Sequence, residues 1–250
     1  MRLVQAEMLK LVRRRGTMIW CALLTIGCVV IADSVLLSLH AANAAKHGPA
    51  GGAENLKHLV FILGGLGNVA AILLGAAAGS QDVSAGVFRD LVVTGRPRRT
   101  LFNVRVPGAL AVFLPLLGVA YAIAVGGAYA FSGSLPQPTA ATVGHYAAYL
   151  VALTGIDIVL AIGLAAFASS RIVVGVLIAW NAIIAQVLIQ IHSLGSARKY
   201  IDVAAAGHFL PAGIDTNAVT MTTATALAVL VAWAAIFMAA GRFWTNRRDA

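Results

Sequence analysis

Six stretches of about 20 or more mainly apolar residues constrain this chain more than any other feature. A helix needs about 20 such residues to cross the hydrocarbon core of a bilayer. We therefore expect an all-α integral membrane protein that forms a single transmembrane domain over residues 1–250. The expected transmembrane helices are 17–39, 59–79, 107–131, 146–168, 172–192 and 218–241.

The composition excludes an ordinary soluble enzyme. The chain is 60% hydrophobic and 11% charged, whereas about 25% of the residues in a soluble domain are charged. Its formal net charge of +9 suggests nucleic acid only if the basic residues share one water-exposed face. Here they lie in short segments between apolar stretches, so no nucleic-acid partner is expected.

The distribution of Lys and Arg predicts the orientation. Fourteen of them precede the first span, follow the last, or lie in the loops 80–106 and 169–171, whereas four lie on the opposite side. The positive-inside rule then places both termini in the cytoplasm, and we expect the chain in the cell inner (cytoplasmic) membrane. A cleaved signal peptide fits less well, because the first apolar stretch exceeds the roughly 7 to 15 residues of a signal core.

Three segments outside the expected spans have recognisable patterns. Residues 1–15 place Val4, Met8 and Leu11 at helical spacing, which predicts an interfacial amphipathic helix. The loop 80–106 predicts a short helix that a Gly-Arg-Pro turn ends; its apolar face lies either on a partner or on the membrane and the helix ends. The outer segment 193–217 is too short to cross, and its apolar part predicts a re-entrant element.

The loop 80–106 also carries a sequence pattern. Asp82, Gly86, Arg89, Leu91, Pro97 and Arg98 stand in order, with Val87 after the glycine. This order resembles the coupling loop of the membrane-spanning permease subunits of type 2 ABC exporters, in which a Thr usually stands where this chain has Val87. Six spans, cytoplasmic termini, an N-terminal amphipathic helix and an Arg-Arg-Asp ending are similar to that family too.

The resemblance implies an export function and specific partners. The seven residues of the loop pattern would form a coupling helix between spans 2 and 3 that contacts two separate ATP-binding subunits, and a second permease copy or a paralogue would complete the path. ATP and Mg are expected in those subunits, because this chain has no G-x-x-x-x-G-K-[ST] phosphate loop. We expect no ATPase site, catalytic residue, cofactor or metal site in this chain, which lies in membrane lipid.

Three polar residues fall inside expected spans. At 1.5 Å per residue, Asp157, Asn181 and Asn68 all lie about 14 to 16 Å from the cytoplasmic ends of their helices. They form either a hydrogen-bonded packing layer or part of a translocation path. An alternative function is an ion- or proton-coupled secondary transporter in which Asp157 binds the ion.

Overall fold

The computed structural model describes residues 2–43, 46, 50–84, 97–210 and 219–247. Within these ranges all regular secondary structure is helical. Six helical stretches are long and apolar enough to cross a membrane. This confirms the prediction of an all-helical, multi-pass membrane protein.

The first stretch consists of α2 (Arg15–Ala22), the π-helical turn η1 (Leu23–Gly27) and α3 (Cys28–Ala42). The second is α5 (Gly52–Ser84). The third consists of α7 (Arg98–Asn103) and α8 (Arg105–Ala130), and the fourth is α9 (Ala140–Leu164). The fifth consists of α10 (Ser170–Ala179), the π-helical turn η2 (Trp180–Ile184) and α11 (Ala185–Gln190), and the sixth is α13 (Thr223–Arg247). Three shorter helices are α1 (Arg2–Val12), η3 (His192–Tyr200) and α12 (Asp202–Gly207).

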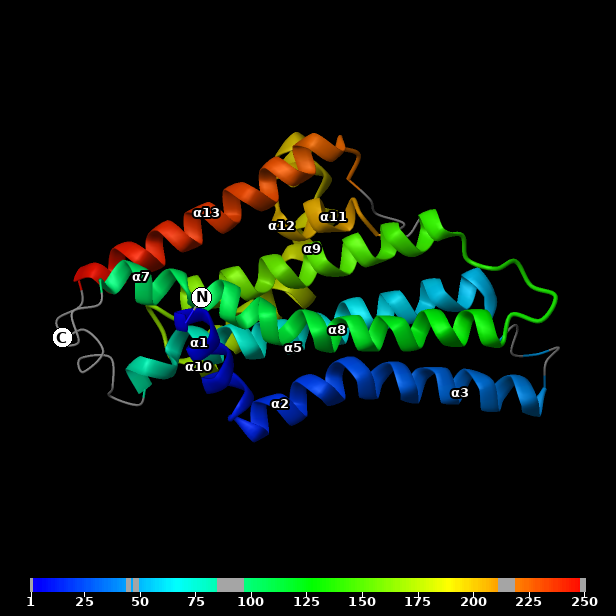
Figure 1. Cartoon of the computed structure of the whole chain (residues 1–250). Coiled ribbons are helices and arrows are strands. Elements are labelled where there is room, and N and C mark those ends of the chain that lie inside the picture. The colour runs from blue at the N-terminus through cyan, green and yellow to red at the C-terminus, as the bar shows by residue number, and fades with distance from the viewer. Residues whose placement is uncertain (1, 44–45, 47–49, 85–96, 211–218, 248–250) are drawn as a thin grey trace.

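Both ends of the described chain lie at the same end of the helical bundle. Figure 1 shows α1, α7 and the C-terminal end of α13 at that end. The helix α1 packs against the beginning of α8, and a Cβ atom at Gly108 would lie 2.7 Å from Cβ of Glu7. An even number of crossings requires this arrangement of the termini.

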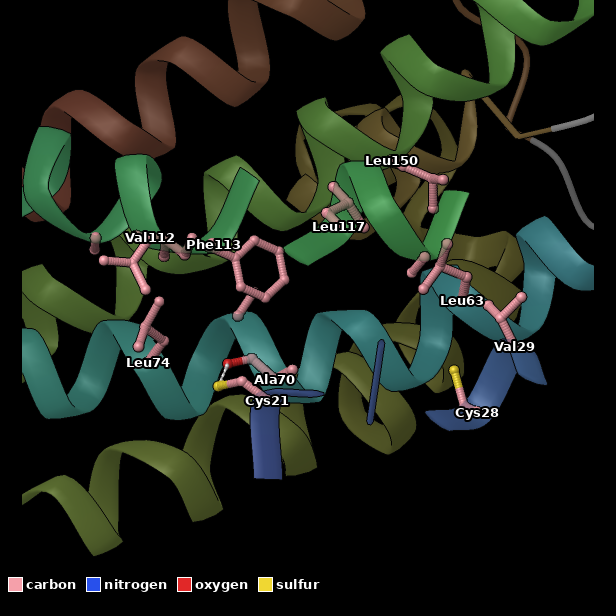
Figure 2. Packing of buried hydrophobic residues seen from close by; sticks show 14 of the residues in the cluster. Cys21, Cys28, Val29, Leu63, Ala70, Leu74, Val112, Phe113, Leu117 and Leu150 are labelled. Atoms are coloured by element: carbon pink, nitrogen blue, oxygen red, sulfur yellow. Dashed lines mark hydrogen bonds between the residues drawn. The ribbon is translucent and has the colours of Figure 1, made fainter. Parts of the chain in front are cut away.

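The helix α5 lies at the centre of the bundle. It packs against α8, α9, α10 and the first stretch, and its Leu63, Ala70 and Leu74 are fully buried. Figure 2 shows these residues in one cluster with Phe113 and Leu117 of α8. The thiol of Cys21 donates to the carbonyl oxygen of Ala70 at 3.6 Å. The second expected span therefore forms the core against which the other helices are placed.

The helices α5 and α9 pack closely at two glycines of α5. A Cβ atom at Gly75 would lie 2.8 Å from Ala161 Cβ, and one at Gly79 would lie 3.0 Å from Ile162 Cα. Small residues spaced four apart permit such an approach of two helices. The similar row on α8 is different, because Cβ atoms at Gly118 and Gly126 would meet nothing within 4 Å.

Several helices extend beyond or are displaced from the expected spans. The second reaches from Gly52 to Ser84 rather than 59–79, the fourth begins at Ala140, and the sixth runs over Thr223–Arg247. Hydropathy marks only the apolar part of a helix, whereas capping residues set where the helix begins. Thr139 accepts a hydrogen bond from the backbone N–H of Thr142 at 3.2 Å, which explains the earlier start of the fourth helix.

Candidate functional site

Asp157 lies within α9 and has only 2% of its surface exposed. Asn181 donates a hydrogen bond from Nδ2 to Asp157 Oδ1 at 2.9 Å. The side chain of Asn68 of α5 lies beside the same carboxyl group. The structure thus brings together the three polar residues that the sequence places at one depth, and they come from three different helical stretches.

The turn that carries Asn181 also binds a second buried carboxyl group, that of Asp202. Asn181 and its neighbour Trp180 both belong to η2, and Trp180 donates from Nε1 to Asp202 Oδ1 at 2.9 Å. A π-helical turn contains one residue more than an α-helical turn, and such turns are frequent at functional sites. Two consecutive residues of η2 therefore bind Asp157 and Asp202, which lie on different helices.

Asp202 begins α12 and is 3% exposed. Burial raises the pKa of Asp202 above its ordinary value, and the hydrogen bond from Trp180 partly offsets this effect. The Trp180 ring lies 5.8 Å from that of Trp233, whose Nε1 donates to the carbonyl oxygen of Tyr200 at 2.8 Å. The sequence reasoning missed this group; an acidic residue at the start of an apolar outer segment was the available signal.

A cavity of about 610 Å³ lies beside this polar cluster, among α5, α9, η2, α11 and α12. Its polar lining residues are Asn68, Tyr149, Asn181, Gln186 and Gln190. The remaining lining residues are Phe, Leu, Ile, Val, Ala and Gly. This size and mixture of surfaces are typical of sites for small organic molecules.

The described residues of the cavity wall carry no formal charge. Among the described residues, no Asp, Glu, Lys, Arg or His lines the cavity. Asn68 is 9% exposed, and its Oδ1 has no hydrogen-bond partner among the described residues. In the same part of the chain, no group of three His, Cys, Asp or Glu side chains is placed to hold a metal ion.

The residues of the coupling pattern are described only in part. Asp82 belongs to the last turn of α5, Pro97 precedes α7, and Arg98 is the first residue of α7. Arg98 donates from Nη1 to the carbonyl oxygen of Asn246, near the end of α13, at 3.3 Å. The other four residues of the pattern lie outside the described residues: Gly86, Val87, Arg89 and Leu91.

Arg105, which the sequence reasoning did not single out, lies at the end of the same loop. It is 2% exposed and donates from Nη1 to the carbonyl oxygen of Gly79 at 2.7 Å. Its guanidinium also lies 5.9 Å from the ring centroid of Phe102. Arg105 thus joins the start of α8 to the C-terminal part of α5, so the two ends of the loop 80–106 lie close together.

Neither a family model, nor a curated protein, nor a solved structure matches this chain. The function is therefore inferred from the chemistry and geometry of the site itself.

Proposed function

We propose that this chain is the permease subunit of an ATP-driven ABC exporter. The observation that carries the proposal is the attachment of the loop 80–106 to the bundle. Arg105 ties its end to Gly79 of α5, and Arg98 ties α7 to the last turn of α13. A force applied to this loop would therefore act on three of the six long helical stretches.

The cavity supports a transport function. It lies beside Asp157, Asn68 and Asn181, which are in the interiors of their helical stretches, and its described residues combine neutral polar and apolar side chains. In the proposed exporter, this surface is the part of the translocation path that one permease contributes. The outer helix α12 then re-enters the membrane, because Trp180 in the middle of the fifth stretch binds Asp202 at its start.

The proposed complex contains two ATP-binding subunits and a second permease copy or paralogue. ATP and Mg bind to the ATP-binding subunits, which contact the coupling helix in the loop 80–106. Both termini lie in the cytoplasm, and α1 lies at the membrane surface, packed on α8. Closure of the partner subunits around nucleotide pushes on the loop and rocks the spans between inward-open and outward-open states.

Copurification tests this proposal. The tagged chain is extracted from its native membrane in mild detergent, companions are identified by mass spectrometry, and ATPase activity is measured on the same sample. We expect a stoichiometric companion with a phosphate loop that is lost when Val87→Glu or Leu91→Glu places a charge on the coupling surface. Ser134→Glu, in the exposed loop at the other end of the bundle, is the matched control and should retain the companion.

A secondary transporter is the second candidate function. The buried carboxyl group of Asp157, held by two asparagines beside a cavity, favours it. A chain that purifies from its native membrane without an ATPase, and that moves solute in proteoliposomes without ATP, would replace the exporter proposal with this one.

A further inference from the structure

We propose that the elbow between α1 and α2, defined as residues 13–15, binds an anionic phospholipid. The headgroup of the lipid lies against the three arginines of the elbow, and one acyl chain lies along the exposed face of α1. This site goes beyond the proposed transport function and does not depend on it.

Packing of α1 on α8 holds the elbow in place. Leu11 is 1% exposed and Glu7 is 5% exposed, and a Cβ atom at Gly108 of α8 would lie 2.7 Å from Cβ of Glu7. The backbone N–H of Arg14 donates to the carbonyl oxygen of Leu11 at 3.0 Å, and that of Met18 donates to the carbonyl oxygen of Arg14 at 3.0 Å. The elbow is therefore a positioned site rather than a loose basic tail.

The elbow carries positive charge that no acidic side chain neutralises in the described part of the chain. Arg13 and Arg15 are exposed and Arg14 is half-buried. Glu7 of α1 forms its ion pair with Lys10, at 2.7 Å, and no ion pair among the described residues includes an arginine of the elbow. A guanidinium group matches the geometry of a phosphate, and clustered basic residues at a membrane surface attract anionic lipids.

An apolar face of α1 lies beside these arginines. Leu9 is 58% exposed and Val12 is 50% exposed, and together with Gln5 and Met8 they line a hollow on the surface. Their spacing of three and four residues places these four on one face of the helix, whereas the buried Leu11 lies on another. An acidic protein partner would satisfy the arginines but has no need of this face, whereas a lipid acyl chain covers it.

An exposed tryptophan indicates the depth of the elbow. Trp20 of α2 is 59% exposed and follows Arg15 by five residues, which corresponds to about 7.5 Å along a helix. Tryptophan side chains are enriched at the boundary between membrane and water. With Trp20 at this boundary, the elbow lies at the level of the lipid phosphates. Figure 1 shows α1 inclined to α2 and α3, as expected for a helix that lies at the membrane surface.

Native mass spectrometry of the purified chain in mild detergent tests the site. It measures the Kd of the first bound dioleoylphosphatidylglycerol and of the first bound dioleoylphosphatidylcholine, which share their acyl chains and differ in headgroup charge. We expect the anionic lipid to bind about tenfold more tightly, and this preference to decrease as the salt concentration rises. Equal affinity for the two lipids would overturn the proposal.

A pair of double variants locates the headgroup. Arg13→Gln with Arg15→Gln should remove the preference for phosphatidylglycerol. Arg99→Gln with Arg242→Gln is the matched control, because these two arginines are also exposed and lie on α7 and α13 at the same end of the bundle. The control should keep the preference. Its equal loss in both double variants would mean that the preference follows the net charge of the chain rather than the elbow.

Two further measurements test the acyl chain. Leu9→Gln should weaken the binding of both lipids about fivefold, whereas Leu227→Gln, at a 50% exposed position on α13, should change neither. Unchanged binding in Leu9→Gln would exclude the exposed face of α1 from the site. Displacement of the lipid by millimolar glycerol phosphate would assign the elbow to a soluble anion instead of a lipid.

These results are independent of the exporter proposal. Loss of the lipid preference would leave copurification of an ATPase untouched. A chain that shows the lipid preference but has no ATPase companion would retain the lipid site and reject the exporter.

Discussion

At the scale of single residues, the arrangement around Asp157 depends on matched donors and acceptors. Its carboxyl group is buried, accepts a hydrogen bond from Asn181 and lies beside Asn68. Polar groups inside a membrane span are costly unless they are paired, so each member of the cluster depends on the others. The cluster therefore both fixes helix packing and sets the polarity of the cavity.

We expect Asp157→Asn to fold and Asp157→Leu to be destabilised. Asparagine retains an acceptor of the same size, whereas leucine leaves the partly buried amide N–H of Asn181 without its acceptor, at a cost of about 1 to 3 kcal/mol. Thermal unfolding in detergent would show the lower midpoint of the leucine variant. Equal midpoints would mean that the cluster does not contribute to stability, and unchanged transport by Asp157→Asn would remove the ionised group from the path.

Asp202→Asn should stabilise the chain increasingly as the pH rises. Burial raises the pKa of Asp202 in the folded chain, so the folded state holds its proton more tightly than the unfolded state does. Folding stability therefore falls as the pH rises from the ordinary carboxyl value through the raised one. Asparagine does not titrate and still accepts the hydrogen bond from Trp180.

Unfolding midpoints from acidic to neutral pH, followed by tryptophan fluorescence, would measure this difference. The two proteins should converge in acid and separate toward neutral pH. A constant difference across the whole range would contradict the assignment of the effect to Asp202.

At the scale of helices, close contact at small residues determines the packing of α5 on α9. We expect Gly75→Val to destabilise the chain by about 1 to 3 kcal/mol, because its Cβ would lie 2.8 Å from Ala161 Cβ and the helices would have to separate. Gly118→Val is the control, because it adds the same side chain at a position where a Cβ atom would meet nothing within 4 Å. Thermal unfolding midpoints of both variants check this prediction. An equal fall of the midpoint in both would show that the helix propensity of valine, rather than the contact between α5 and α9, is responsible.

The number and order of the long helices were predictable, whereas their ends were not. Each apolar stretch is visible because a membrane helix needs a minimum length, but helices continue past the apolar part. Hydrogen bonds from backbone N–H groups to Thr139 and Thr222 mark the true beginnings of the fourth and sixth helices. These short Thr-x-x-Thr patterns are local signals that hydropathy does not weigh.

For the candidate site, the sequence predicted only how deep its three polar residues lie along their helices. Counting residues places Asn68, Asp157 and Asn181 at one level, but it does not determine which way they face. Trp180 and Asn181 belong to the π-helical turn η2 and bind their carboxyl partners from there, and nothing in the residue types of this turn predicts it. Arg105 was missed because its partner is the backbone carbonyl group of Gly79. Asp202 was missed because its partner, Trp180, lies 22 residues away in the sequence.

At the scale of the whole molecule, both ends of the chain share one end of the bundle (Figure 1). We expect Gly16→Cys to react with a membrane-impermeant maleimide only after cell lysis, and Ser134→Cys to react in intact cells. Both positions are exposed and lie at opposite ends of the bundle. The native Cys21 and Cys28 are buried, so the unmodified chain should label poorly and serves as the background.

Labelling of Gly16→Cys in intact cells would reverse the proposed orientation. It would also place the loop 80–106 outside the cell, where no cytoplasmic ATPase can contact it. The same experiment therefore tests the proposed location of the partner subunits independently of copurification.

The extra residue in η2 has a consequence for everything that follows it in the fifth stretch. One residue corresponds to about 100° of rotation around a helix, so removing the π turn would swing Gln186 and Gln190 out of the cavity wall. A single backbone register thus determines whether this helix presents amides or aliphatic side chains to the cavity.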